Sequence, residues 1–117
     1  MNERDMLKAT MSNSKSNIIF LDIERKYVDI SDCVFIDSNL KKTDLVGKSI
    51  QEAFQNEEWT KIVAESHKQV IESGEAMEFE EYAIINGKKI FYSALKFPVF
   101  NSGGKIIGTG AISNYKK

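Results

Sequence analysis

Histidine and cysteine, the side chains most often used in nucleophilic catalysis and zinc binding, are scarce in this sequence. There is one histidine, His67, with Glu65 and Lys68 close by, and one cysteine, Cys33. A Ser–His–Asp or Cys–His site would have to use this one imidazole, and no spacing in the chain gives it a partner. One His with one Cys also matches no recognised metal-ligand spacing. We therefore expect no enzymatic activity and no metal site, with His67 on an exposed helix face and Cys33 in the core.

The helix that carries this histidine is the clearest element of the sequence. Over residues 57–73, apolar side chains such as Trp59, Ile62 and Val63 recur at helical spacing and form one stripe. Glutamates occupy the first turn, where the helix dipole favours anions, and Gly74 is placed to end the helix. The spacing predicts one long helix over 57–73.

Strand patterns lie on both sides of this helix. Before it, an apolar run and an alternating segment predict a hairpin, and short helical segments follow. After Gly74 the apolar period changes to two residues, and Asn86–Gly87 is a strong hairpin signal. The predicted strands are 18–21, 27–30, 76–85, 88–97 and 105–113, with a turn at 98–104. The first residues lack such a pattern, so we expect a helical or flexible lead-in over 1–16 and a folded domain over 17–115.

The two-residue turn also predicts which residues share a face of the last hairpin. The pairs on one face are Tyr82 with Phe91, Glu80 with Ser93, and Glu78 with Leu95. Because the charged Lys96 belongs to the opposite face, we expect the first face to look toward the helices. The expected pocket lining is Phe54, Trp59, Ile62, Val63, Glu80, Tyr82, Phe91, Ser93 and Leu95. Glu78 or Glu80 would then favour a cationic or hydrogen-bond-donating ligand. Alternatively, the apolar members fill the space and leave a solid core.

In this order and spacing, four groups of residues resemble the PAS sensor-domain family. They are the opening hairpin 18–30, the Leu-Val-Gly-Lys box at 45–48, Gly74 after the long helix, and Pro98-Val99 followed by Gly104-Lys105-Ile106-Ile107-Gly108. Asn114 or Tyr115 stands where many relatives carry an aspartate. The resemblance implies an α+β fold, a five-stranded antiparallel sheet with short helices and one longer helix on one face. Such a sheet can leave its other face in water.

The resemblance also implies a function. Family members sense small molecules, light or redox state, or dimerise, within histidine kinases, cyclases or transcription regulators. We therefore expect a sensory or interaction domain that binds a small molecule in its core, mediates dimerisation, or does both. The alternatives are a solid-core dimerisation module, and a small enzyme or carrier on a similar cupped scaffold. The enzyme or carrier would need convergent titratable groups, such as Glu78, Glu80 and Tyr82 together.

The positions of the histidine and the cysteine argue against the two best-known cofactors of this family. Relatives that hold haem carry a histidine about three turns before the terminating glycine, which is near Val63 here, whereas His67 lies one turn later. Relatives that use flavin photochemistry carry a cysteine in an Asn-Cys-Arg-Phe-like motif after the short helices. Cys33 lies earlier and lacks that motif. We predict neither haem nor flavin.

Composition limits the partners and the location. The 117 residues are 42% hydrophobic and 28% charged with a net charge of −1, which is typical of one soluble domain. Residues 82–117 hold six lysines and no acid, but these are dispersed and without arginine, so we expect no nucleic-acid partner. A polar start, one cysteine and the lack of long apolar runs predict a cytoplasmic protein without a membrane segment. Met6, Leu7 and Met11 would give a short leading helix one apolar side, which favours a homodimer.

Overall fold

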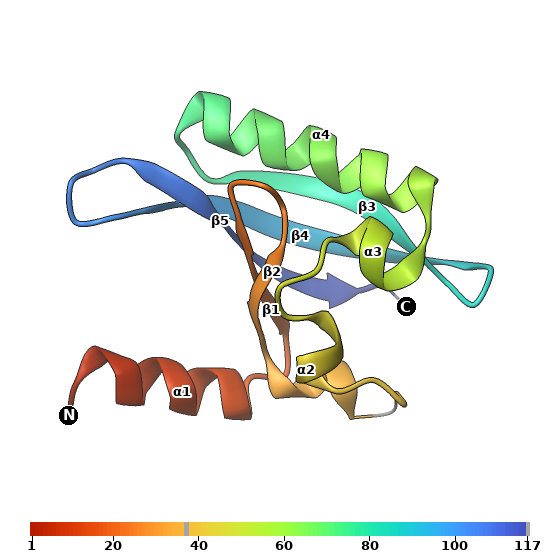
Figure 1. The fold of residues 1–117 in the computed structure, drawn as a ribbon, viewed down its shortest axis with the longest axis horizontal. Helices are drawn as coiled ribbons and strands as arrows, with labels where there is room; N and C mark the ends of the chain where they lie inside the picture. The colour runs from red at the N-terminus through yellow and green to blue at the C-terminus, as the bar shows by residue number, and fades with distance from the viewer. Residues whose placement is uncertain (37, 117) are drawn as a thin grey trace.

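The computed structural model describes residues 1–36 and 38–116. Over these residues a helix precedes a strand hairpin, four helical segments follow, and three longer strands complete the fold (Figure 1). In chain order the elements are α1 (Glu3–Asn13), β1 (Asn17–Asp22), β2 (Tyr27–Ile30), the 3-10 helix η1 (Asp32–Phe35), α2 (Lys42–Leu45), α3 (Ile50–Phe54), α4 (Glu57–Ser73), β3 (Met77–Ile85), β4 (Lys88–Phe100) and β5 (Ile106–Tyr115).

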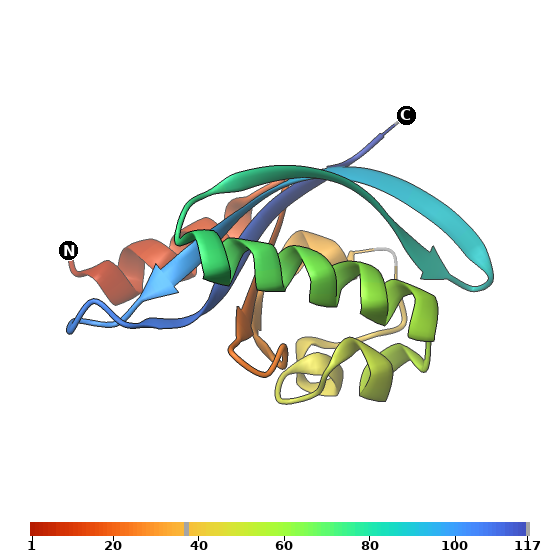
Figure 2. The same ribbon diagram turned by 90° about the horizontal axis from the view of Figure 1, so that it is seen from above.

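The strands form one antiparallel sheet in the order β2-β1-β5-β4-β3. The sheet is curved, and α4 and the short helices lie on its concave side (Figure 2). Apolar side chains of the first hairpin pack there against side chains of the helices. The buried core cluster is Leu21, Tyr27, Ile30, Leu45, Ile50 and Val63. The predicted α+β fold, with helices on one face of a five-stranded sheet, is confirmed.

Local signals in the sequence set the long helix and the last hairpin. The Asn56 side chain accepts a hydrogen bond from the backbone N–H of Trp59 at the start of α4, and Gly74 ends the helix at φ +67°. Asn86 and Gly87 turn between β3 and β4, both with positive φ. The pairing of Tyr82 with Phe91 across this hairpin is the predicted register.

Among the described residues, no helix, α4 included, is long and apolar enough to cross a bilayer.

Most strand boundaries lie within two residues of the prediction, but the end of β4 differs by three. β4 does not stop before Pro98; it runs to Phe100, and Pro98 pairs with Thr109 of β5. β3 begins at Met77, opposite Lys96, so β4 has a neighbour on one side only beyond that point. A proline is tolerated there because its missing N–H falls on an unpaired edge. The turn is therefore shorter than predicted and lies between Phe100 and Ile106.

The N-terminal residues form a regular helix, α1, that runs away from the sheet (Figure 1). Asn2 caps its start, with its side chain accepting a hydrogen bond from the N–H of Asp5. Met11 is buried where the helix meets η1, whereas Met6 and Leu7 remain about half exposed. The apolar side of α1 is thus only partly covered within one chain.

Candidate functional site

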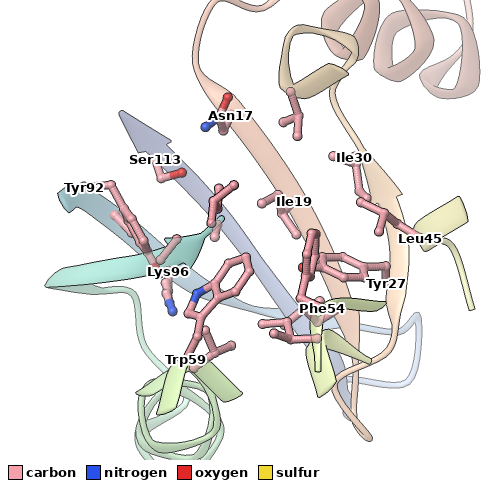
Figure 3. A pocket seen from close by; sticks show the side chains of 18 of the residues that line it. Asn17, Ile19, Tyr27, Ile30, Leu45, Phe54, Trp59, Tyr92, Lys96 and Ser113 are labelled. Atoms are coloured by element: carbon pink, nitrogen blue, oxygen red, sulfur yellow. The ribbon is translucent and has the colours of Figure 1, made fainter. Parts of the chain in front are cut away.

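The concave side of the sheet borders a partly open cavity of about 190 Å³. Its walls come from the inner faces of β1, β3, β4 and β5, from the first hairpin and from α3 and α4 (Figure 3). Most of the lining is apolar. The apolar side chains around it include Ile19, Leu21, Ile30, Val34, Phe35, Leu45, Ile50, Phe54, Val63, Ala83, Ala94 and Ala111. A cavity of this size and lining favours a small, mainly apolar occupant.

The cavity exists because small residues occupy the inner face of the central strands. Ala94 of β4 pairs with Ser113 of β5, and Ala111 lies between Lys96 and Ile19 in the sheet. Ala83 contributes another short side chain from β3. Larger side chains at these positions would fill the space between the sheet and α4. The solid core considered as an alternative is therefore not what the structure has.

A buried polar cluster lies on the β3–β4 side of the cavity. Lys96 Nζ donates to Glu81 Oε1 at 2.8 Å and to Ser66 Oγ of α4 at 2.6 Å. The Tyr92 hydroxyl donates to the same Glu81 oxygen at 2.8 Å. Glu81 and Lys96 are each only 7% exposed. Burial lowers the pKa of Lys96, and the nearby Glu81 carboxylate acts in the opposite direction.

Tyrosine hydroxyls are held in their neutral form in this environment. Burial is the main cause that raises the pKa of Tyr92, and the Glu81 carboxylate raises it further. Burial alone raises the pKa of Tyr27, whose ring lies across the cavity from Tyr92 (Figure 3). Both hydroxyls can therefore donate hydrogen bonds but do not carry charge at neutral pH.

Trp59 lies at the N-terminal end of α4 and lines the cavity beside Phe54, with ring centroids 5.0 Å apart. Its indole nitrogen faces the side of the cavity that holds Tyr92 and Lys96 (Figure 3). Among the described residues, this buried Nε1–H has no hydrogen-bond partner.

His67 does not lie on the exposed face of α4, as the sequence analysis expected; it is 3% exposed. Its Nε2 lies 3.4 Å from the carbonyl oxygen of Ile23, and its Nδ1 is 2.9 Å from Thr109 Oγ1. Because the carbonyl can only accept, Nε2 carries the proton and Nδ1 of the neutral ring accepts from Thr109. Burial lowers the pKa of His67. The prediction failed because both partners are distant in the sequence.

The structure brings together only part of the predicted pocket lining. Phe54, Trp59 and Val63 line the cavity, whereas Ile62 lies on α4 but not against the cavity. The predicted face of the last hairpin is wrong: its members lie on the outer face of the sheet, and Phe91 and Leu95 are 52% and 40% exposed. The misplaced residues are Glu80, Tyr82, Phe91, Ser93 and Leu95, together with Glu78.

The prediction is wrong because the charged side chain of Lys96 faces inward and not toward solvent. Lys96 is inside because Glu81, on the same inner face, neutralises it. Tyr92, Ala94 and Lys96 alternate along β4 and share the inner face. The small residues Ser113 and Ala111 of β5 pair with Ala94 and Lys96, and this group of small residues indicates the inner face. Because Glu78 and Glu80 lie on the outer face, the expectation that one of them would favour a cationic ligand is also wrong.

Cys33 is also placed differently from the prediction. It is partly exposed at the start of η1 and not packed in the core. Its thiol donates to the carbonyl oxygen of Ser16 at 3.1 Å. No group of three or more His, Cys, Asp or Glu side chains suited to a metal ion occurs in the part of the chain that the structure describes.

Comparison with known proteins identifies the family. The model of the PAS-fold family matches residues 11–114, nearly the whole chain. The chain therefore belongs to the PAS family and is a PAS sensory domain. None of the curated proteins compared with the chain matches it.

Solved structures share this fold at low sequence identity. The PAS domain of BvgS from Bordetella pertussis has a TM-score of 0.79 at 15% identity, covering 99% of this chain and 88% of that one. A PAS domain from Colwellia psychrerythraea has a TM-score of 0.80 at 10% identity, with 98% of each chain covered. VqmA from Vibrio cholerae has a TM-score of 0.78 at 16% identity, and the whole of this chain spans 52% of VqmA.

Proposed function

We propose that this domain senses a small, largely apolar molecule held in the inner cavity. In this proposal it is the input part of a signal-transduction protein, such as a histidine kinase, a cyclase or a transcription regulator. The cavity supports the proposal, because about 190 Å³ of mainly apolar, partly open space lies beneath α4. An engineered apolar cavity of about 150 Å³ is known to bind benzene, so this one suits a single ring with a small substituent.

Two solved structures of VqmA are described in terms that agree with ligand sensing. One structure is described as VqmA bound to DPO, with a TM-score of 0.76 at 17% identity. Another is described as a complex of VqmA with ligand and DNA. Ligand binding by this chain is our inference from the cavity and from this similarity of fold.

The proposal is tested by filling the cavity from within. Ala94→Leu adds three carbons at a buried position that lines the cavity. Ser93→Leu places the same side chain on the outer face of the same strand and serves as the control. Acetophenone and its hydrocarbon analogue α-methylstyrene should raise the melting temperature of the wild type and of Ser93→Leu but not of Ala94→Leu. If neither compound at millimolar concentration changes the melting temperature of the wild type, the proposal fails.

Native mass spectrometry with a visible absorption spectrum of the purified protein provides a second test. We expect no haem or flavin band, and a retained molecule, if present, with a mass that fits the cavity. A Soret or flavin band in protein prepared with the cofactor present would overturn the prediction that the domain binds neither.

The domain is proposed to be non-enzymatic, cytoplasmic and without a nucleic-acid partner. The enzyme or carrier alternative needed Glu78, Glu80 and Tyr82 in a pocket, and these lie on the outer face. The lysines of the C-terminal part include Lys96, which is buried against Glu81, and Lys116, which pairs with Glu80. These pairings reduce the positive charge available to phosphates. We further propose that residues 17–115 form the sensory domain and that 1–16 precede it.

Homodimerisation is a second proposed function and rests on a separate observation. Met6 and Leu7 of α1 and the outer-face residues Phe91, Leu95 and Ile112 expose apolar side chains to solvent. A helix of eleven residues is marginally stable in water unless its apolar side is covered, and a second copy of the chain can cover it. One solved relative is described as a VqmA dimer.

A further inference from the structure

The indole N–H of Trp59 is a hydrogen-bond donor held in place without an acceptor. Asn56 fixes the backbone of Trp59 at the start of α4, and the Phe54 ring packs against the indole. Nε1 is buried and makes no hydrogen bond of normal geometry to a described residue; it is close enough to the Tyr92 hydroxyl to lower the pKa of that group slightly, against the larger effect of burial. A buried donor without a partner destabilises the folded state, so such groups are rare and call for a specific explanation.

The polar groups on the same side of the cavity are occupied by one another. Oε1 of Glu81 already accepts from both Lys96 and Tyr92. Lys96 uses two of its three N–H groups, toward Glu81 and Ser66. This side of the cavity thus presents a free N–H on Trp59 and the remaining N–H of Lys96. Among the described residues of this cluster, the Glu81 carboxylate already accepts two hydrogen bonds at Oε1, so the groups left unpaired include these two donors.

The charges of this cluster already cancel. Lys96 and Glu81 form an ion pair at 2.8 Å, so an ionised ligand would bring an uncompensated charge into a mainly apolar cavity. Burying an unpaired charge is strongly unfavourable. A neutral molecule avoids this cost and can still accept a hydrogen bond.

We propose that the ligand is a neutral, single-ring-sized molecule with a carbonyl oxygen, ether oxygen or ring nitrogen that accepts a hydrogen bond from Trp59 Nε1. This inference rests on the proposed function, since it names the ligand class of the same cavity. The apolar part of the ligand lies against the alanine positions of β3 and β4. Its acceptor atom faces the side of the cavity that holds Trp59 and Lys96.

The test compares two compounds of nearly equal shape. Acetophenone carries a carbonyl oxygen where α-methylstyrene carries a methylene group, and benzoate serves as an anionic analogue. Dissociation constants are measured from the backbone amide shifts of Ala83 and Ala94 in the ¹⁵N-labelled 117-residue chain. Because Trp59 is the only tryptophan, the spectrum also contains one indole N–H signal, which reports on this donor directly.

We expect acetophenone to bind the wild type about tenfold more tightly than α-methylstyrene, as one hydrogen bond to an otherwise unpaired donor predicts. Acetophenone should move the indole signal downfield, and α-methylstyrene should not. In Trp59→Phe the ratio of the two affinities should fall to within about twofold, because the donor is removed for both compounds, whatever the smaller ring does to the affinity of each. Benzoate should bind more weakly than acetophenone.

Equal affinities of the two neutral compounds for the wild type would overturn this inference and leave the proposed function intact. A preference for acetophenone that persists in Trp59→Phe would show that another group is the donor. Tighter binding of benzoate would refute the neutral ligand class. If none of the three compounds binds, the proposed function itself fails.

Discussion

Glu81 of β3 and Lys96 of β4 form an ion pair on the inner face of the sheet, with 2.8 Å between Oε1 and Nζ. Both side chains are almost completely buried beneath α4, where Ser66 provides the third member of the cluster. Because Lys96 is held on the inner face by this pair, the alternate residues Tyr92 and Ala94 of β4 also face inward. The pair therefore determines which face of the last hairpin lines the cavity.

Removing one member of the pair should be strongly destabilising. Lys96→Met leaves the Glu81 carboxylate buried without its cation, which typically costs about 3–5 kcal/mol of unfolding free energy. Adding Glu81→Gln removes the stranded charge and keeps an acceptor for the Tyr92 hydroxyl, so the double variant should recover most of the loss. Urea unfolding at pH 7 measures both. A loss of under about 1 kcal/mol in Lys96→Met alone would contradict this account.

His67 should make stability depend on pH in the mildly acidic range. Its pKa in the folded state is lowered from 6.5, mainly by burial and further by Arg25 and Lys96, against the opposing effects of the Ile23 carbonyl and Asp22. The unfolded chain therefore binds a proton before the folded chain does, and stability falls as the pH drops below about 6.5. Above that pH the ring is neutral in both states and the effect is absent.

His67→Gln removes this titration and isolates its contribution. The urea midpoint of the wild type should fall more between pH 7.5 and pH 5.5 than that of the variant. Carboxylates contribute to the pH dependence of both proteins, whereas His67 contributes only to that of the wild type. Parallel changes in the two proteins would show that His67 does not titrate differently on folding.

Gly108 should tolerate no side chain. A Cβ at this position would meet the carbonyl oxygen of Leu21 in the paired strand β1, and backbone cannot move aside as a flexible side chain can. Gly108→Ala is expected to cost about 1–3 kcal/mol of unfolding free energy through separation of β1 from β5. Gly103→Ala is the matched control, because an added Cβ there would lie 3.4 Å from its nearest neighbour, Asn101 Oδ1, in an exposed turn. Equal effects of the two substitutions would argue against this close approach of the strands.

The proposed dimer can be tested without shortening the chain. Deleting residues 1–16 would also remove the Ser16 carbonyl that accepts from Ser31 and Cys33. We therefore use Met6→Glu with Leu7→Glu, on the exposed apolar side of α1. At tens of micromolar, the wild type should sediment as a dimer and this variant as a monomer.

The control for the dimer test is Lys8→Glu with Ser12→Glu, which adds two glutamates at other exposed positions of the same helix. This variant should remain dimeric. Sedimentation of the wild type as a monomer at that concentration would refute the dimer. Dissociation by the control as well would show that added charge, not the position of Met6 and Leu7, is responsible.

The elements of the fold could be predicted where short-range signals determine them. The bounds of α4 follow from its apolar stripe, its capping residue and Gly74, and the register of the β3–β4 hairpin follows from Asn86–Gly87. The end of β4 was missed, because tolerance of Pro98 depends on where β3 begins. That starting point is a property of the assembled sheet, not of the segment around the proline.

The cavity was harder to predict because its features depend on residues far apart in the chain. The orientation of the last hairpin depends on whether Lys96 has a buried partner, and both faces of the hairpin are amphipathic. The partners of His67 are more than 40 residues away in each direction. Trp59 could be placed at the cavity from its helical stripe, but the unpaired state of its indole N–H depends on every wall around it.

The burial of Lys96 has a consequence for the reactivity of the lysines toward acylating reagents. An amine reacts only when it is unprotonated and a reagent can reach it. Nζ of Lys96 is buried between the sheet and α4 and is hydrogen-bonded to Glu81 and Ser66. Acylation at this position therefore requires the reagent to pass into the cavity beneath α4, while exposed lysines such as Lys61 react directly. The ratio of the two labelling rates, followed by mass spectrometry, would measure how readily a reagent reaches this part of the fold under native conditions.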